Sequence, residues 1–357
     1  MLMGRLVLVG CITGTLVLGH IGDNIQSIVA KAKRDKLQTA IARLSQQKST
    51  VGIYVNDVAH DTRSNIWVCG SVWLLRGLLL SINESRISIT TLPYLTTVQS
   101  LTFASPSNGW AIGDYRYIYS TIDEGRTWRK NLKAEANLTS ICFVGALNGW
   151  VSGWHGNIYH TSNGGASWSP QNSGTHYDLS NVTFVDDSHG WAIGGAAIGR
   201  SREWSSVLIT TNDGGQTWRP LSPPPQLRSI VFANASRGSG LDLKGNIYYT
   251  VDGGRTWLLR YEARGHALRS LFFLDDSRGW AVGETVLHTT DGGMNWSRIA
   301  RNKLEYSLDD VVFADPLNGW GISQYPVRLY RTMDGGGTWL SLPDDWKNRA
   351  IEESALK

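Results

Sequence analysis

The sequence predicts an all-β fold: a seven-bladed β-propeller with four-stranded blades, preceded by an N-terminal apolar segment and a helix. Three observations support this prediction. The 357 residues include 39 glycines and 16 tryptophans, which indicates many turns and a large residue reused at one kind of position. From residue 51 onward, a unit of about 40 residues recurs. Each unit carries the same three motifs in the same order, so the units are expected to be the blades.

The first motif is an apolar residue, a polar pair and then an apolar alternation, which is typical of a short strand with one buried face. It predicts the first, innermost strand of each blade. The copies are VNDVAH (55–60), VQSLTF (98–103), LTSICF (138–143), LSNVTF (179–184), LRSIVF (227–232), LRSLFF (268–273) and LDDVVF (308–313).

The second motif is a tight turn followed by Gly-Trp, as in NGWAIG (108–113), and it predicts the turn into the second strand. Its tryptophan lies at positions 67, 110, 150, 191, 280 and 320, and Ser239 replaces it in the fifth copy. The third motif reads Thr-x-Asp-x-Gly-x-Thr-Trp, the Asp-box, and its copies begin at residues 121, 161, 211, 250, 289 and 332. A worn copy lies at 81–88. Counting each motif gives seven blades.

The acidic or amide residue of each box is expected to be structural. Its side-chain oxygen can accept backbone N–H groups across the turn, glycine supplies a positive φ, and tryptophan packs back over the sheet. A calcium loop needs several acidic ligands, whereas these boxes have one or two, so no metal is expected. The residues concerned are Asp123, Asn163, Asp213, Asp252, Asp291 and Asp334.

The chain divides into four parts. Residues 1–22 are apolar after Arg5 and are expected to be a signal peptide or a membrane anchor. Residues 8–11 resemble a lipobox, so Cys11 is a candidate lipidation site. Residues 23–50 follow as an amphipathic helix or linker with a basic face, then the propeller at 51–343 and a C-terminal tail at 344–357. A cleaved signal, a retained anchor and a lipidated cysteine all place the propeller outside the cytoplasm.

Charge and cysteine content exclude several classes of protein. A net charge of +4 without an aromatic-basic groove motif does not indicate nucleic acid binding. Three widely spaced cysteines do not form a disulfide framework, and Cys69 and Cys142 are expected in the core. No cofactor is expected. A single propeller buries its own core, so the chain is expected to be a monomer.

The pairing of Gly-Trp-Ala-x-Gly with Asp-Gly-Gly-x-Thr-Trp at this period resembles the photosystem II stability and assembly factor family. The resemblance covers residues 51–343 and implies a lumenal seven-bladed propeller of the BNR type. It also implies a protein client that is contacted through an arginine-rich patch. This client is expected to be a membrane protein or its acidic or carboxylate-bearing segment. The expected location is therefore the thylakoid lumen or the periplasm, at the membrane. Relatives occur in non-photosynthetic bacteria, so an envelope scaffold or receptor-like propeller is an alternative.

Candidate partner-binding residues are arginines that vary between copies and fall at one face. Arg228 and Arg269 hold the same position at the start of adjacent inner strands, where four other copies carry neutral residues and the last copy carries Asp309. An insertion at 194–206 adds further candidates, since arginine and tryptophan are favoured at interfaces. The full set is Arg116, Arg200, Arg202, Trp204, Arg228, Arg269 and Arg328. The alternative interpretation is that these arginines only keep a solvated face soluble.

A glycoside hydrolase or sialidase is the enzymatic alternative, because both can carry Asp-boxes. Glycoside hydrolysis usually needs two carboxyl groups at a set separation. Asp57 and Asp310 are the candidates, since they become neighbours if the first and last blades close the ring. Sialidases carry an Arg-Ile-Pro motif that this chain lacks. The sequence therefore favours a binding protein over an enzyme.

Overall fold

The computed structural model describes residues 53–60, 66–72, 76–82, 87–92, 97–113, 116–198, 203–222, 226–299, 304–344 and 347. The predicted N-terminal segment (1–22), the predicted helix (23–50) and Cys11 lie outside the described residues, as do Arg200 and Arg202. The C-terminal tail is described only at Asp344 and Lys347.

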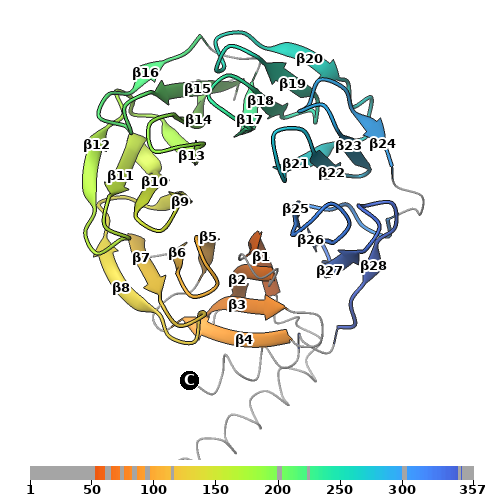
Figure 1. Cartoon of the computed structure of the whole chain (residues 1–357), viewed down its shortest axis with the longest axis horizontal. Helices are drawn as coiled ribbons and strands as arrows, with labels where there is room; N and C mark the ends of the chain where they lie inside the picture. The colour runs from red at the N-terminus through yellow and green to blue at the C-terminus, as the bar shows by residue number, and fades with distance from the viewer. Residues whose placement is uncertain are drawn as a thin grey trace, which may run out of the picture. The chain divides into compact units, whose positions relative to one another are not determined.

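The described residues form seven antiparallel sheets of four strands, each built from four consecutive strands of the chain. Figure 1 shows the sheets arranged radially around a centre, with the first strand of each sheet innermost. This confirms the predicted seven-bladed propeller. In each blade the first motif forms the inner strand, and the Gly-Trp motif begins the second strand.

The first four blades consist of β1 (Ile53–His60), β2 (Ile66–Val72), β3 (Arg76–Ile82), β4 (Ile87–Leu92); β5 (Val98–Phe103), β6 (Gly109–Gly113), β7 (Tyr117–Thr121), β8 (Arg129–Lys133); β9 (Leu138–Val144), β10 (Asn148–Gly153), β11 (Asn157–Thr161), β12 (Ser169–Asn172); and β13 (Asp178–Phe184), β14 (Gly190–Ile198), β15 (Glu203–Thr211), β16 (Arg219–Pro220). A short 3-10 turn, η2 (Trp154–Gly156), lies between β10 and β11. The last three blades consist of β17 (Leu227–Phe232), β18 (Gly238–Asp242), β19 (Ile247–Thr250), β20 (Leu258–Tyr261); β21 (Leu268–Phe273), β22 (Gly279–Gly283), β23 (Val286–Thr289), β24 (Ser297–Arg298); and β25 (Asp310–Phe313), β26 (Gly319–Gln324), β27 (Val327–Thr332), β28 (Leu340–Ser341).

Each Asp-box is a self-contained turn between the third and fourth strands. In blade 4, Asp213 Oδ1 accepts the backbone N–H of Thr217 at 2.9 Å and the hydroxyl of Thr211 at 2.8 Å. Its second oxygen accepts the hydroxyl of Thr217 at 2.6 Å. Gly215 has a φ of 86°, which explains why glycine is needed there. Both side-chain oxygens of Asp213 are therefore used in hydrogen bonds of its own turn.

Aromatic side chains join each blade to the next. In blade 3, Trp150 stacks on Phe184 of blade 4 at a centroid distance of 3.6 Å. Phe184 in turn meets the box tryptophan of its own blade, Trp218, edge-on at 5.8 Å. Trp150 also donates its indole N–H to the carbonyl of Gly214 in the next Asp-box at 3.0 Å. Burial of these rings supplies a large hydrophobic contribution at the junction.

The same arrangement recurs around the ring, and it explains why the motifs repeat together. Stacked pairs across junctions are Trp67–Phe103, Trp110–Phe143, Trp191–Phe232 and Trp280–Phe313. The Gly-Trp glycine faces the same phenylalanine, because a Cβ on Gly190 would lie 2.3 Å from the Phe184 ring. The tryptophans and aspartates are therefore committed to building the ring, and function must lie in residues that vary between copies.

The two ends of the ring differ in the chain segments they expose. At one end, the inner strands begin and the second strand turns into the third; we call this the mouth face. At the other end lie the turns between the first and second strands, together with the Asp-boxes; we call this the box face. The strand registers define both ends, since Val98 pairs with Gly113 at the mouth face and Phe103 pairs with Gly109 at the box face.

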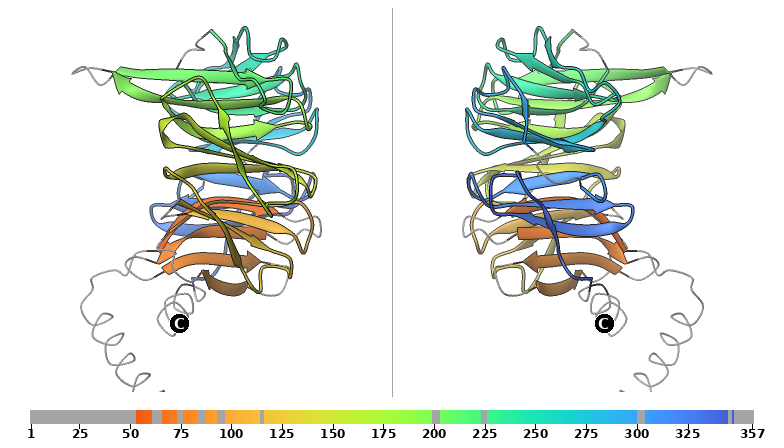
Figure 2. Two further views of the ribbon diagram at one scale, coloured as in Figure 1. Left: turned by 90° about the vertical axis from the view of Figure 1, so that its left-hand side faces the viewer. Right: turned by 90° about the vertical axis from the view of Figure 1, so that its right-hand side faces the viewer.

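The insertion at 194–206 lengthens the hairpin of blade 4. Strands β14 and β15 have nine residues each and remain paired as far as Ile198 and Glu203. Figure 2 shows this hairpin extending well beyond the other blades. It does so at the mouth face, because the blade's inner strand begins opposite Gly195. We call residues 195–198 and 203–206 the ribbon.

No helix among the described residues combines the length and the apolar character that a membrane crossing requires.

Candidate functional site

A β-bulge at the start of the inner strand sets the position of the two central arginines. The register with the second strand shifts between Leu227 and Ser229 in blade 5 and between Leu268 and Ser270 in blade 6. The residue skipped in each case is an arginine, Arg228 or Arg269. A bulge bends the strand and re-aims the extra side chain. The bulge residue, which differs from one blade to the next, is therefore directed towards the mouth face.

Neutral residues at this position make a contact between blades. Asn56 donates to the carbonyl of Val98 at 2.7 Å, and Thr139 donates to the carbonyl of Leu179 at 2.6 Å. Arg228 makes the equivalent contact with the carbonyl of Leu268 at 3.4 Å. An asparagine or a threonine is sufficient for this bond. Arginine at the same position therefore adds charge and additional N–H donors that the contact between blades does not need.

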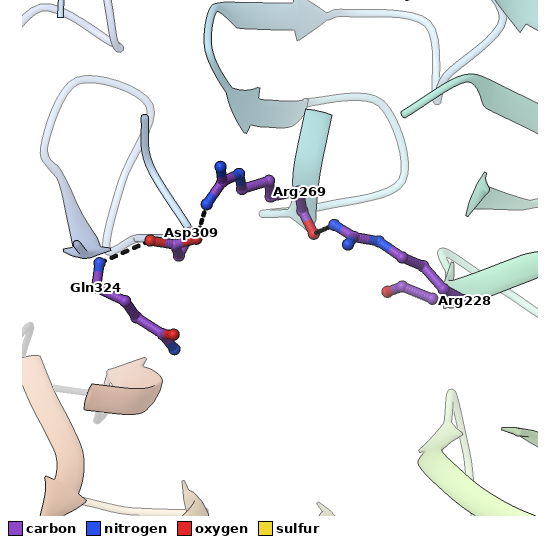
Figure 3. Close-up of a pocket in the computed structure, with 5 residues that line it drawn as sticks. Arg228, Arg269, Asp309 and Gln324 are labelled. Carbon is purple, nitrogen blue, oxygen red and sulfur yellow. Dashed lines mark hydrogen bonds and ion pairs between the residues drawn. The ribbon is translucent and has the colours of Figure 1, made fainter. Parts of the chain in front are cut away.

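Arg228 and Arg269 line one pocket with Ser229, Asp309 and Gln324, and its cavity has a volume of about 430 Å³. Figure 3 shows these side chains in a row along the pocket. Arg228 donates to the carbonyl of Arg269, and Arg269 donates to Asp309. The second oxygen of Asp309 accepts the backbone N–H of Gln324 at 2.6 Å. The pocket volume is within the range of small-ligand sites, and its wall is polar.

The electrostatics of the pocket favour an anion. Burial lowers the pKa of Arg228, and the nearby charge of Arg269 lowers it further, while Asp309 and Asp242 act in the opposite direction. The guanidinium group remains protonated, because arginine starts from a very high pKa. Both guanidinium groups line this pocket, and a bound carboxylate would accept hydrogen bonds from them and offset the repulsion between their charges. The pocket can therefore hold a carboxylate group.

The other predicted partner-binding residues do not line this pocket. Arg116 has a φ of 65° and donates to the carbonyl of Glu135, on the connection that follows the outer strand of blade 2. Arg328 pairs with Asp344, beyond the last strand. Both lie in or beside loops of the mouth face, as predicted, but they contact the periphery of their blades. Trp204 is in strand β15, within the ribbon.

Sequence reasoning missed a set of exposed aromatic side chains on the same face. The aromatic residues of the described chain that are largely exposed are Tyr54, Trp154, Tyr177 and Tyr325, and Tyr325 is 73% exposed. Each lies at the start of an inner strand or between the second and third strands, so all four are at the mouth face. Exposed aliphatic residues such as Ile122, Val251 and Met333 lie instead in the Asp-boxes. Of these four, the sequence pattern identified Trp154 from its loop between the second and third strands, and it missed Tyr54, Tyr177 and Tyr325.

The predicted neighbours Asp57 and Asp310 do meet where blades 1 and 7 close the ring. The two carboxyl groups are close enough to interact electrostatically. Burial and the charge of Asp310 raise the pKa of Asp57 to about 7. Ser100 donates to Asp57 at 2.8 Å and Ser270 donates to Asp310 at 2.6 Å. Each carboxyl group is therefore tied to the inner strand of a neighbouring blade.

The fold and the site describe a class of protein: an Asp-box propeller with a pocket lined by two arginines at its mouth face. The particular family follows from the sequence. A family model described as photosynthesis system II assembly factor YCF48 matches residues 79–176 and 221–308, which are more than half of the chain. The chain belongs to this family.

Individual relatives are more distant. A stretch of 116 residues is 28% identical to the photosystem II assembly lipoprotein Ycf48 of Synechococcus sp. (strain CC9902), covering 31% of this chain and 34% of that protein. The match therefore spans only about a third of the relative's length.

Two solved structures share the fold. A structure of YCF48 bound to D1 peptide has a TM-score of 0.56 and 21% identity, covering 70% of this chain and 82% of that one. YCF48 from Cyanidioschyzon merolae has a TM-score of 0.59 and 17% identity, covering 82% and 96%. At these identities, the similarity supports the propeller architecture.

Proposed function

We propose that this chain is a non-catalytic photosystem II assembly factor that holds a segment of a membrane-protein client on its mouth face. The observation that carries the proposal is the pocket in which Arg228 and Arg269 lie side by side. An arginine pair with several directed donors suits a carboxylate, which is an acidic side chain or the free end of a chain. The client class comes from the family, and the D1 peptide of the YCF48 structure is the natural first probe.

The composition of the mouth face supports binding of a protein. Tyrosine, tryptophan and arginine are the residues that dominate the energy of protein interfaces. Here Trp154, Tyr177 and Tyr325 are exposed on the face that carries the arginine pocket. The aromatic side chains offer apolar contact area with little loss of side-chain entropy, while the arginines select for charge. An extended peptide fits this combination better than a small isolated anion does.

Absence of catalysis is part of the proposal. The six clear Asp-box residues hold their own turns, as Asp213 does, and Asp57 and Asp310 are tied to the inner strands of neighbouring blades. We also propose that the protein works outside the cytoplasm at a membrane, in the thylakoid lumen or the periplasm. This rests on the apolar residues 6–22, with Cys11 as the candidate lipidation site.

The test replaces both pocket arginines with glutamine. Charge reversal is unsuitable, because Arg228 donates to main-chain carbonyls that a carboxylate would repel. Glutamine keeps an N–H donor and removes the charge. Fluorescence anisotropy measures binding of a D1 peptide synthesised with a free terminal carboxylate. This peptide is expected to bind the R228Q/R269Q variant at least about tenfold more weakly than the unmodified chain.

A matched control removes the same charge from the box face. Arg126 pairs with Glu124 there, and Arg255 donates to the carbonyl of Asp252, so the control variant is R126Q/R255Q. It is expected to bind the peptide as the unmodified chain does. Equal weakening in both variants would show that net charge alone matters, and no weakening in R228Q/R269Q would refute the pocket as the binding site.

A further inference from the structure

The arginine pocket already contains a carboxylate of its own. Arg269 donates to Asp309 Oδ1, and in this ion pair the side chains are 39% and 16% exposed. The other oxygen of Asp309 accepts the backbone N–H of Gln324 at 2.6 Å. Asp309 is therefore fixed from both sides, with one oxygen directed at the arginine that a client carboxylate would use.

Asp309 differs from the other acidic group near the pocket. Asp242 is buried and is used by its own turn, where it accepts the backbone N–H groups of Lys244 and Asn246, each at 2.8 Å. Its second oxygen accepts the side-chain amide of Asn246 at 2.8 Å. Among the described residues that line the pocket, Asp309 alone has a carboxylate in contact with a pocket arginine.

The position of Asp309 in the repeat also sets it apart. It aligns with the bulge residues of the other blades, which are Asn56, Gln99, Thr139, Ser180, Arg228 and Arg269. None of these carries a negative charge. The contact between blades at this position needs only a neutral donor such as Asn56. The negative charge of Asp309 is therefore not required for the contact between blades, and in the structure it pairs with Arg269.

We propose that Asp309 is an internal competitor for the client's carboxylate: it occupies Arg269 in the free protein and releases it when the client binds. This inference rests on the proposed function of the pocket. The exchange replaces one partly exposed ion pair with another, which has a small net cost. After release, Asp309 still accepts the N–H of Gln324, so its charge keeps a hydrogen-bond donor.

Competition from Asp309 limits the affinity of the pocket for a client carboxylate and makes the pocket selective for anionic groups. A neutral ligand cannot replace Asp309 at Arg269, so the pocket selects for an anionic group. A carboxylate that does bind must first displace a tethered one, which weakens the complex and favours release. Such moderate affinity suits a protein that holds its client temporarily.

The experiment compares the unmodified chain with Asp309→Asn. Asparagine has nearly the same size and keeps an oxygen for the N–H of Gln324, but it cannot compete as an anion. Two probes are used: a synthetic ten-residue peptide ending in a free carboxylate, and the same peptide with an amidated end. We expect D309N to bind the carboxylate probe about five- to tenfold more tightly, with the affinity for the amidated probe unchanged.

Asp276→Asn is the matched control. Asp276 forms a comparable ion pair with Arg237 at 3.7 Å, but on the box face. It is expected to leave both affinities unchanged. Equal tightening by D276N would assign the effect to net charge and would overturn the proposal.

The remaining outcomes separate the two levels of inference. If the unmodified chain binds the carboxylate probe and D309N binds it equally or more weakly, then Asp309 positions Arg269 instead of competing for it, and only this inference fails. If neither protein distinguishes the two probes, then the pocket does not take carboxylates, and both this inference and the pocket's proposed function fail. Thermal unfolding of each variant confirms that the ring is intact.

Discussion

At the scale of single residues, the local environment decides whether the pKa of an aspartate is lowered or raised. Hydrogen bonds from the side chain and the backbone of Thr127 lower the pKa of the Asp-box residue Asp123 to about 2. Burial and the charge of Asp310 raise the pKa of Asp57 to about 7. Both belong to the same residue type in the same fold. The difference follows from solvation, because the box aspartate is at the surface and Asp57 is enclosed at the ring closure.

The Asp57–Asp310 pair makes stability depend on pH. The folded-state pKa of Asp57 lies above the ordinary aspartate value of 3.8, so the folded chain binds a proton more tightly than the unfolded chain. The stability this proton provides is present at low pH and is lost as the pH rises through about 7. We expect the melting temperature to fall by several degrees between pH 5.5 and 8.5, measured by circular dichroism.

Asp57→Asn isolates this effect, because asparagine imitates the protonated acid and can donate to Asp310. The variant is expected to melt at nearly the same temperature across that pH range. Asp276→Asn serves as the control and should retain the original pH dependence. An unchanged slope in D57N would assign the pH dependence to other groups.

At the scale of elements, the Asp-box shows how one turn tolerates a substitution. In blade 3 the box residue is Asn163, whose Oδ1 accepts the N–H of Ser167 at 3.0 Å and whose amide donates to the Ser167 hydroxyl at 2.8 Å. In blade 4, Asp213 accepts from both groups of Thr217. Because a hydroxyl can donate or accept, asparagine and aspartate serve the same turn.

This equivalence predicts a contrast between two variants of Asp213. Asp213→Asn is expected to change the free energy of unfolding by less than about 1 kcal/mol, while Asp213→Ala should destabilise by about 1–3 kcal/mol because it removes every acceptor. Urea denaturation measures both. The box is not held together by its aspartate if the alanine variant is as stable as the asparagine variant.

Much of the fold could be predicted at this scale, because the ring is built from local motifs. Each Asp-box closes on itself within eight residues, and each Gly-Trp motif follows a short turn, so both are visible in the sequence. The worn copy in blade 1 still yields paired strands, since Ile82 pairs with Ile87. The lengthened hairpin at the insertion could be located but not described, because strand length depends on pairing between its two halves.

At the scale of the whole molecule, the ring closes without exchanging a strand. Each of the seven sheets uses four consecutive strands, so within the described residues blades 1 and 7 share no strand pairing. Gln324 of blade 7 donates to the carbonyl of Val55 in blade 1 at 2.6 Å, close to the Asp57–Asp310 pair. The same Gln324 lines the arginine pocket, so the pocket adjoins the ring closure.

A deletion in the ribbon tests whether the client contacts the mouth face beyond the pocket. Replacing residues 196–205 with Asn-Gly joins Gly195 to Ser206, which are paired partners, through a two-residue turn. We expect the melting temperature to change by no more than about 2 °C, because the described part of the ribbon extends beyond the neighbouring blades. If the insertion contributes to client binding, as its arginines and tryptophan predict, affinity for the D1 peptide should fall about tenfold. Unchanged affinity would restrict the site to the pocket.

The sequence by itself determined the number of blades, the order of strands and the structural role of the aspartates and tryptophans. These follow from contacts within one repeat or between adjacent repeats, which recur and can be recognised. Only the tertiary structure decided that Arg228 and Arg269 share a pocket while Arg116 and Arg328 do not, and that Asp309 occupies Arg269. The physical reason is that side chains about 40 residues apart meet through β-bulges and ring geometry, which no local pattern records.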